Sequence, residues 1–132
     1  MTNILEKIIA EKNNSIKKYK DIYSIKDMKN KISSCVNYMD FKNKLIQKKV
    51  SAIAEIKKAS PSAGVIIENY DPKSIAKQYL NAGADCLSIL TEEKYFQGKL
   101  EHIEQVKKET KLPVLCKDFF IDPFQVLLAK SY

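Results

Sequence analysis

The sequence predicts an α/β fold, in which helices alternate with the strands of a parallel sheet. Three strand-like runs occupy residues 51–57, 86–91 and 113–117, and each is followed by a helical pattern of apolar residues. The runs recur at roughly 30 residues, which is the length of one βα unit. Strands that alternate with helices in this way favour a parallel sheet with right-handed crossovers.

The composition is typical of a soluble globular protein. The 132 residues are 45% hydrophobic and 30% charged, and a chain of this length can bury a core. No apolar run approaches the ~20 residues of a membrane helix, and the N-terminus has no continuous apolar stretch of the signal-peptide kind. We therefore expect a cytoplasmic protein with no membrane partner. Cys35, Cys86 and Cys116 form no CxxC pair and have no nearby histidine, so neither a disulfide framework nor a metal site is indicated.

The formal net charge of +7 suggests a nucleic acid or an acidic ligand as a partner. All 23 basic residues are lysines, however, and they are spread along the whole chain. Proteins that recognise base edges, or that bind phosphate in a bidentate manner, rely heavily on arginine. The charge therefore favours a solvated surface over nucleic-acid binding, and it is compatible with an anionic small-molecule ligand.

Residues 1–50 are expected to form an N-terminal helical extension that precedes the first strand. Asn3 can cap a first helix, with Glu6 at the third helical position as the second half of a capping box. Ser24 and Asp40 begin two further helical stretches. This extension can be either a layer over a core or a separate interaction arm.

Residues 51–132 are expected to contain three βα units. Asp71–Pro72 is a helix start, with an aspartate cap and a proline in the first turn, and Gly83 is placed for a left-handed C-terminal cap. The run at 86–91 is nearly continuous in apolar residues and is followed by a helix with an apolar stripe. Asp122–Pro123 repeats the earlier helix start after the third strand.

The stretch from residue 51 to residue 62 places charged residues where a strand would normally end in apolar ones. Strand side chains alternate between two faces, so Glu55 and Lys57 share one face. An acid and a base at the mouth of a strand are costly to bury without a use. Ligands of parallel α/β folds bind at the carboxyl ends of the strands, and Lys117 stands at that end of the third strand. Two ammonium groups and one carboxylate there favour an active site for an anionic substrate.

These residues can also have roles that involve no catalysis or binding. Lys57, Lys58 and Lys117 can instead be solvated at strand ends. Tyr95 and Phe96, in the loop after the second strand, can be packing residues.

Three further polar residues receive no role. We expect Glu92 and Glu93, in the same loop, to be solvated. We expect His102, between a glutamate and an isoleucine on the following helix, to lie on the surface.

Four motifs together resemble the indole-3-glycerol phosphate synthase family. They are Ala54-Glu-Ile-Lys-Lys-Ala-Ser-Pro-Ser62, Asp71-Pro72, Leu90-Thr-Glu-Glu-Lys-Tyr-Phe96 and Pro113-Val-Leu-Cys-Lys-Asp-Phe-Phe-Ile-Asp-Pro-Phe-Gln125. They occur in the order and spacing of the family. With the opening Ile4-Leu-Glu-Lys-Ile8, the resemblance covers the whole chain.

The resemblance implies a (β/α)₈ TIM barrel, of which this chain would hold the N-terminal extension and about three βα units. It implies the ring closure of 1-(2-carboxyphenylamino)-1-deoxyribulose 5-phosphate in tryptophan biosynthesis, with loss of carbon dioxide and water and with no cofactor. By resemblance, Lys117 is the general acid that protonates the ketose oxygen. Lys57 holds the anionic groups of the substrate, and Glu55 orients the lysines and handles a proton in later steps. The resemblance also implies three substrate-binding residues, with the aromatic ones around the anthranilate ring: Ser60, Phe96 and Phe119.

The family draws further catalytic and phosphate-binding residues from later strands. We therefore expect that this chain alone neither closes a barrel nor turns over substrate at a useful rate, and that a complementary C-terminal half or a fused pathway enzyme is its partner. Two alternatives remain. One is a non-catalytic half-barrel that serves binding or assembly. The other is a different phosphate-binding barrel enzyme such as phosphoribosylanthranilate isomerase, which fits the Glu-x-Lys strand and the Lys-Asp-Phe motif less well.

Overall fold

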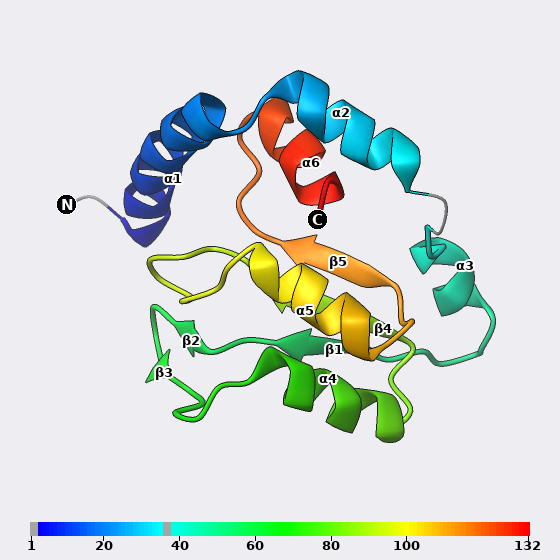
Figure 1. Ribbon diagram of the computed structural model, residues 1–132. Helices are drawn as coiled ribbons and strands as arrows, with labels where there is room; N and C mark the ends of the chain where they lie inside the picture. Colours follow the sequence, from blue (N-terminus) through cyan, green and yellow to red (C-terminus); the bar gives the residue numbers. More distant parts are fainter. Residues whose placement is uncertain (1–2, 36–37) are drawn as a thin grey trace. The chain divides into compact units, whose positions relative to one another are not determined.

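The computed structural model describes residues 3–35 and 38–132, which divide into two compact units (Figure 1). One unit joins the chain up to Tyr38 with residues 119–132 and is helical. The other comprises residues 39–118 and carries all the strands of the described chain. The α/β pattern expected from the sequence is therefore present, and it is concentrated in the second unit.

The helical unit contains α1 (Ile4–Ile22), α2 (Ile25–Ser34) and α6 (Pro123–Lys130). Each helix begins after a residue whose side chain accepts a hydrogen bond from a free backbone N–H of the first turn: Asn3, Ser24 and Asp122. The capping box predicted between Asn3 and Glu6 is confirmed, with bonds of 2.9 and 3.1 Å. Helix α6 packs against both α1 and α2.

The second unit is built around a three-stranded parallel sheet with the strand order β1-β4-β5. Its elements are α3 (Phe41–Ile46), β1 (Ile53–Ile56), β2 (Ala59–Ser60), β3 (Gly64–Val65), α4 (Pro72–Asn81), β4 (Cys86–Leu90), α5 (Glu101–Glu109) and β5 (Val114–Lys117). The short β2 and β3 form an antiparallel hairpin directly after β1. The strand positions predicted from the three apolar runs are thus confirmed.

Helices α4 and α5 pack together and cover one face of this sheet (Figure 1). Strand β4 is central and all five of its residues are buried, which explains why its sequence is nearly continuous in apolar residues. The fully buried side chains include Ile56, Leu87 and Ile89 of the sheet and Val106 of α5. Each such side chain contributes about 1.5–3 kcal/mol through its removal from water, so the sheet–helix core is the main source of stability in this unit.

Helix α4 also fixes the end of β1. Asp71 caps it, Pro72 occupies its first turn, and Gly83 follows it with a φ of +87°, as the sequence predicted. From the middle of this helix, the hydroxyl of Tyr79 donates a 3.0 Å hydrogen bond to the backbone carbonyl of Glu55. The strand that carries the predicted site is therefore attached to the helix behind it.

The opposite, amino-terminal end of the sheet contacts α3. The hydroxyl of Ser51 donates a 2.7 Å hydrogen bond to the carbonyl of Leu45, and Lys48 pairs with the buried Asp85 at 2.5 Å. Cys86 is buried beside α3, where it packs as a small apolar residue. The domain boundary at residue 50 stays a prediction, although α3 and the sheet belong to one compact unit.

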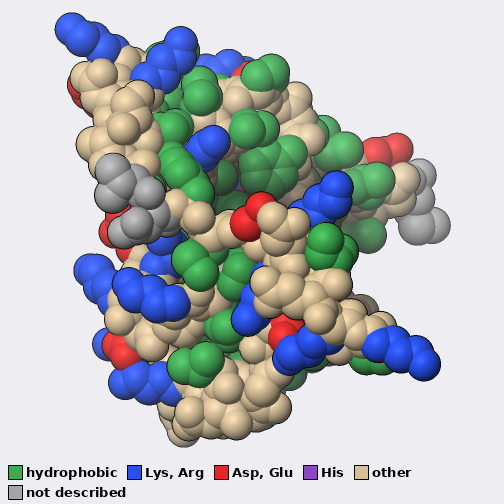
Figure 2. Space-filling model, turned by 90° about the vertical axis from the view of Figure 1, so that its right-hand side faces the viewer, with side chains coloured by type: hydrophobic (Ala, Val, Ile, Leu, Met, Phe, Trp, Pro, Cys, Tyr) green, Lys and Arg blue, Asp and Glu red, His purple; other side chains and the backbone are tan. Residues whose placement is uncertain are grey.

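The surface is rich in lysine. Figure 2 shows lysine side chains at several separate places on one face, with apolar and acidic side chains between them. Within residues 3–35 and 38–132, no helix is both long and apolar enough to cross a membrane.

Candidate active site

Glu55 contacts two lysines at the carboxyl end of the parallel sheet. Lys57 Nζ lies 2.9 Å from Glu55 Oε1, and Lys117 Nζ lies 3.7 Å from Glu55 Oε2. These three residues are called the Glu55 cluster below. The structure therefore brings together the three residues that were predicted from the sequence to carry the chemistry.

The strand register explains why residues of two non-adjacent strands meet here. Glu55 is aligned with Ser88 of β4, and Lys117 is aligned with Leu90, two residues further along the same strand. Residues two apart on a strand share a face, so Glu55 and Lys117 project on the same side of the sheet. The long lysine side chain then spans the width of β4.

The Glu55 cluster is partly open to solvent and carries an excess of one positive charge. About a third of the Glu55 and Lys57 side chains is exposed, and 55% of the Lys117 side chain. Ion pairs with this exposure contribute at most about 1 kcal/mol each, so they do not lock the three side chains in place. An arrangement of this kind can bind an anion and can move a proton between nitrogen and oxygen atoms.

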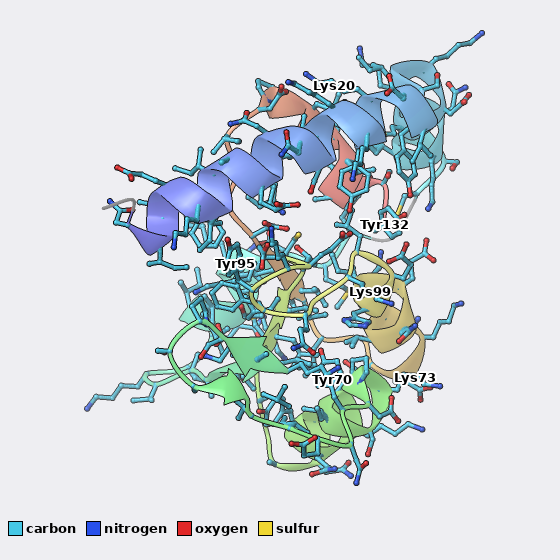
Figure 3. All side chains as sticks on the ribbon, turned by 90° about the vertical axis from the view of Figure 1, so that its left-hand side faces the viewer. Lys20, Tyr70, Lys73, Tyr95, Lys99 and Tyr132 are labelled. Atoms are coloured by element: carbon cyan, nitrogen blue, oxygen red, sulfur yellow. The ribbon has the colours of Figure 1, made fainter. Side chains whose placement is uncertain are left out.

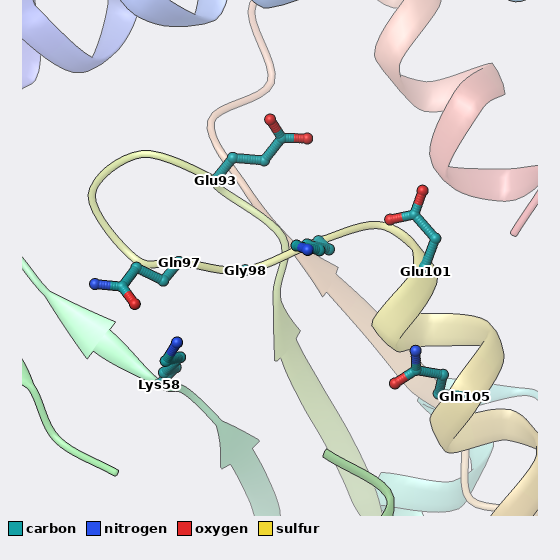
Figure 4. A pocket seen from close by; sticks show the side chains of 7 residues that line it. Lys58, Glu93, Gln97, Gly98, Glu101 and Gln105 are labelled. Carbon is teal, nitrogen blue, oxygen red and sulfur yellow. The ribbon is translucent and has the colours of Figure 1, made fainter. Parts of the chain in front are cut away.

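Lys57 and Lys58 both follow the end of β1, but Lys58 does not belong to the Glu55 cluster. It lines an open pocket of about 620 Å³ together with residues of the β4–α5 connection and of α5 (Figure 4). The other lining residues are Glu93, Gln97, Gly98, Lys99, Glu101 and Gln105. Lys57 therefore contacts Glu55, whereas Lys58 lines this pocket. No residue of the Glu55 cluster lines the pocket.

The three predicted substrate-binding residues lie in different places. Ser60 belongs to the β2–β3 hairpin, where its hydroxyl accepts a 3.1 Å hydrogen bond from the N–H of Ala63. Phe96 lies in the loop after β4. Phe119 belongs to the helical unit, where its carbonyl accepts a 2.8 Å hydrogen bond from the side chain of Gln125. Their contacts with a substrate stay predictions.

The prediction that Glu92 is solvated is wrong, whereas its neighbour Glu93 is exposed as expected. Only 2% of Glu92 is exposed. Its carboxylate accepts hydrogen bonds from the backbone N–H groups of Lys94, Tyr95 and Phe96, at 3.1, 2.7 and 2.9 Å (Tyr95 is labelled in Figure 3). These bonds offset the cost of burying a charge, which explains why this carboxylate can lie inside the loop.

The prediction that His102 lies on the surface is also wrong. His102 is 9% exposed, and its ring lies beside that of Tyr70, with 5.4 Å between the ring centroids. Tyr70 is labelled in Figure 3. Burial, followed by the nearby charge of Lys99, holds the pKa of His102 below its ordinary value. Burial and the adjacent Asp71 raise the pKa of Tyr70 to about 12. Both rings are therefore uncharged packing groups at neutral pH.

Thr91 and Asp118 also lie beside the site, although the sequence did not predict a role for either residue. The buried hydroxyl of Thr91 donates a 2.8 Å hydrogen bond to Asp118 Oδ2, and the N–H of Thr91 donates a 3.0 Å bond to the carbonyl of Lys117. One signal was present in the sequence: Thr91 is the last residue of the predicted strand at 86–91, and Asp118 directly follows the predicted strand at 113–117. Among the residues that the structure describes, no group of three or more His, Cys, Asp or Glu side chains is arranged to hold a metal ion.

Fold and site together define a class of protein: a parallel β/α protein with a lysine–carboxylate cluster at the carboxyl ends of its strands. A family model described as indole-3-glycerol phosphate synthase matches residues 5–132. The chain belongs to the indole-3-glycerol phosphate synthase family, whose members are TIM barrels. Three parallel strands of such a sheet are described here.

Curated relatives with this name are similar along nearly the whole chain. The indole-3-glycerol phosphate synthase of Acaryochloris marina is 43% identical over 131 residues, which cover 98% of this chain and 43% of the relative. That of Prochlorococcus marinus (strain AS9601) is 45% identical over 130 residues, covering 97% of this chain and 44% of the relative. The chain therefore spans less than half the length of these relatives.

Proposed function

We propose that this chain provides the amino-terminal wall of the active site of an indole-3-glycerol phosphate synthase, a carboxy-lyase of tryptophan biosynthesis. The observation that carries the proposal is the Glu55 cluster, in which two ammonium groups contact one carboxylate. The substrate, 1-(2-carboxyphenylamino)-1-deoxyribulose 5-phosphate, carries a carboxylate and a phosphate. Its negative charges suit the positive excess of the cluster.

In the proposed mechanism, Lys117 acts as the general acid. The carbon of the anthranilate ring that bears the carboxylate attacks the ketose carbonyl carbon, and Lys117 donates a proton to the carbonyl oxygen, which becomes a hydroxyl group. Loss of carbon dioxide then restores the aromatic ring. The hydroxyl group leaves as water after a second proton transfer, and loss of a proton from the new ring completes the indole.

Lys57 and Glu55 support these steps. Lys57 attracts the anionic groups of the substrate. Glu55 orients both lysines through its two oxygens and accepts a proton in the later steps. Ser60 and Phe96 are proposed to bind the substrate, with the ring of Phe96 against the anthranilate ring. Phe119, in the helical unit, is proposed as a further substrate-binding residue that contacts the same ring.

A chimera tests the proposal, because this chain matches only 43–44% of the relatives' length. Residues 1–132 replace the matched segment of the Prochlorococcus marinus relative, and formation of indole-3-glycerol phosphate is followed by fluorescence. We expect turnover by the chimera, and Lys117→Ala is expected to lower its rate by about 100-fold or more. Lys58→Ala is the matched control, since Lys58 lines a pocket that the Glu55 cluster does not line, and it should leave the rate within a few-fold of the parent.

The non-catalytic alternative gives a different result. A chimera that folds, as judged by circular dichroism, but forms no product would favour a binding or assembly module. Equal rates for the parent and Lys117→Ala would remove Lys117 from the mechanism. The family match disfavours phosphoribosylanthranilate isomerase as an alternative.

A further inference from the structure

The loop between β4 and α5 is organised around one buried carboxylate. Glu92 Oε1 accepts the N–H of Lys94, and Glu92 Oε2 accepts the N–H groups of both Tyr95 and Phe96. The backbone carbonyl of Glu92 accepts a fourth hydrogen bond, from the N–H of Gly98 at 2.8 Å. A single residue thus binds the backbone of most of the loop.

The end of the loop is held equally closely. A Cβ atom added to Gly98 would lie 2.2 Å from the carbonyl oxygen of Leu90, so the backbone at this position passes directly over the end of β4. The preceding Gln97 has a φ of +52°, a left-handed conformation that is uncommon for residues other than glycine. The loop therefore has one tightly defined path, which begins and ends against β4.

The arrangement makes Glu92 unsuited to acid–base chemistry and suited to positioning. Both of its carboxylate oxygens already accept N–H groups, and the side chain is shielded from solvent. Hydrogen bonds to an ionised acceptor are stronger and more directional than neutral ones. A buried carboxylate with three such donors fixes backbone directions more closely than an apolar side chain in the same place would.

We infer that Glu92 is a positioning residue for ligand binding: its carboxylate orders the backbone at Lys94–Phe96 and so sets where the ring of Phe96 stands. This inference rests on the proposed function, in which Phe96 packs against the anthranilate ring. Loss of the carboxylate should then weaken binding of the aromatic part of the ligand. It should leave the attraction between the Glu55 cluster and the anionic part of the ligand unchanged.

The test uses the chimera of residues 1–132 with the remainder of the Prochlorococcus marinus relative as the parent, because the chain alone spans less than half of such a protein. The variants are Glu92→Gln, Glu92→Ala and the matched control Glu93→Gln, since Glu93 is the exposed neighbour. Amide hydrogen exchange at residues 94–96 is measured by NMR. Binding is measured by calorimetry with two probes. The first is a substrate analogue whose ketone is reduced to an alcohol, and the second is a pentitol 5-phosphate, which lacks the aromatic ring.

We expect exchange at residues 94–96 to be about tenfold faster in Glu92→Gln, and faster still in Glu92→Ala, because the amide of glutamine cannot accept all three N–H groups. The reduced analogue should bind Glu92→Gln about tenfold more weakly, the effect of one lost charge-assisted bond. The pentitol phosphate should bind the parent and Glu92→Gln equally. Glu93→Gln should match the parent in every measurement.

Two results would overturn the inference. One is unchanged amide exchange in Glu92→Gln. The other is an equal loss of affinity for both probes, which would indicate a general structural role. If the parent binds neither probe, the proposed function itself fails. A different outcome would contradict only the role of Glu92. In that outcome, the parent binds the aromatic probe and Glu92→Gln binds it equally well.

Discussion

The hydroxyl of Thr91 donates a 2.8 Å hydrogen bond to Asp118 Oδ2, and this bond joins the residues that directly follow β4 and β5. Thr91 is buried, and its N–H also donates to the carbonyl of Lys117. The carbonyl of Lys117 and the side chain of the next residue are therefore both bonded to the residue that follows the central strand. The position of the proposed general acid depends on a residue that has no part in the chemistry.

Replacing Thr91 by valine should destabilise the sheet, because it removes the hydroxyl while keeping the shape of the side chain. We expect Thr91→Val to lower the free energy of unfolding by about 1.5–3 kcal/mol, the typical contribution of a hydrogen bond to a charged partner. Urea denaturation measures it, with Thr91→Ser, which keeps the hydroxyl, as the control. A valine variant as stable as the serine variant would contradict the prediction.

Gly98 should tolerate no side chain. In Gly98→Ala the new Cβ would lie 2.2 Å from the carbonyl oxygen of Leu90, so the loop must move away from β4, at a cost of about 1–3 kcal/mol. Gly83→Ala is the comparison, because Gly83 has a positive φ but free space around it, and its replacement should cost about 1 kcal/mol. Both values come from urea denaturation. Equal destabilisation by the two changes would show that the close approach at Gly98 does not matter.

His102 should make stability depend on pH between about 7.5 and 5.5. Its pKa in the folded protein lies below the ordinary value of 6.5, chiefly through burial. The unfolded chain therefore binds a proton at a higher pH than the folded one, and stability is lost as the pH falls through 6.5 towards the folded pKa.

The chain contains one histidine, so a single variant isolates this effect. The free energy of unfolding of the parent should fall between pH 7.5 and 5.5, and that of His102→Phe, which keeps an aromatic ring beside Tyr70, should change less. Urea denaturation at the two pH values measures both. Parallel pH profiles of the two proteins would remove His102 as the cause.

Asp85 should titrate below the ordinary range of aspartate. The hydrogen bond from Lys48, followed by that from the N–H of Ala52, lowers the pKa of its carboxyl group from 3.8. Its contribution to stability is present above pH 4 and is lost as the pH falls through the folded pKa. NMR titration should show a higher pKa for Asp85 in Lys48→Met than in the parent. Lys49→Met, which changes the exposed neighbour, should leave that pKa unchanged.

Features set by local sequence could be predicted. The helix start at Asp71–Pro72 and the left-handed residue Gly83 follow from cap preferences that act within a few residues, and both are observed. Strand alternation likewise predicted that Glu55 and Lys57 share a face, and they form an ion pair. These predictions succeeded because each depends on the chain within one turn or one strand.

The burial of a polar residue by a different segment of the chain could not be predicted from the sequence. Glu92 and Glu93 are adjacent and chemically identical, yet only the first lies inside the loop, because the backbone closes around it. His102 is buried by Tyr70, which lies before α4, more than thirty residues earlier in the chain. No pattern within either segment distinguishes these residues from solvated ones.

The position of Glu55 between Lys57 and Lys117 makes it a built-in counterion. Two ammonium groups without it would repel each other and attract chloride from the solvent. Glu55 already balances one of the two positive charges, so a ligand must compete with it for the lysines. The electrostatic binding free energy of the ligand is then the difference between the attraction of the ligand to the lysines and the attraction of Glu55 to them. A simple monovalent anion gains little from that competition, whereas a ligand with two negative groups can engage both lysines. The cluster therefore selects for multiply charged ligands before any contact with the rest of the pocket is made.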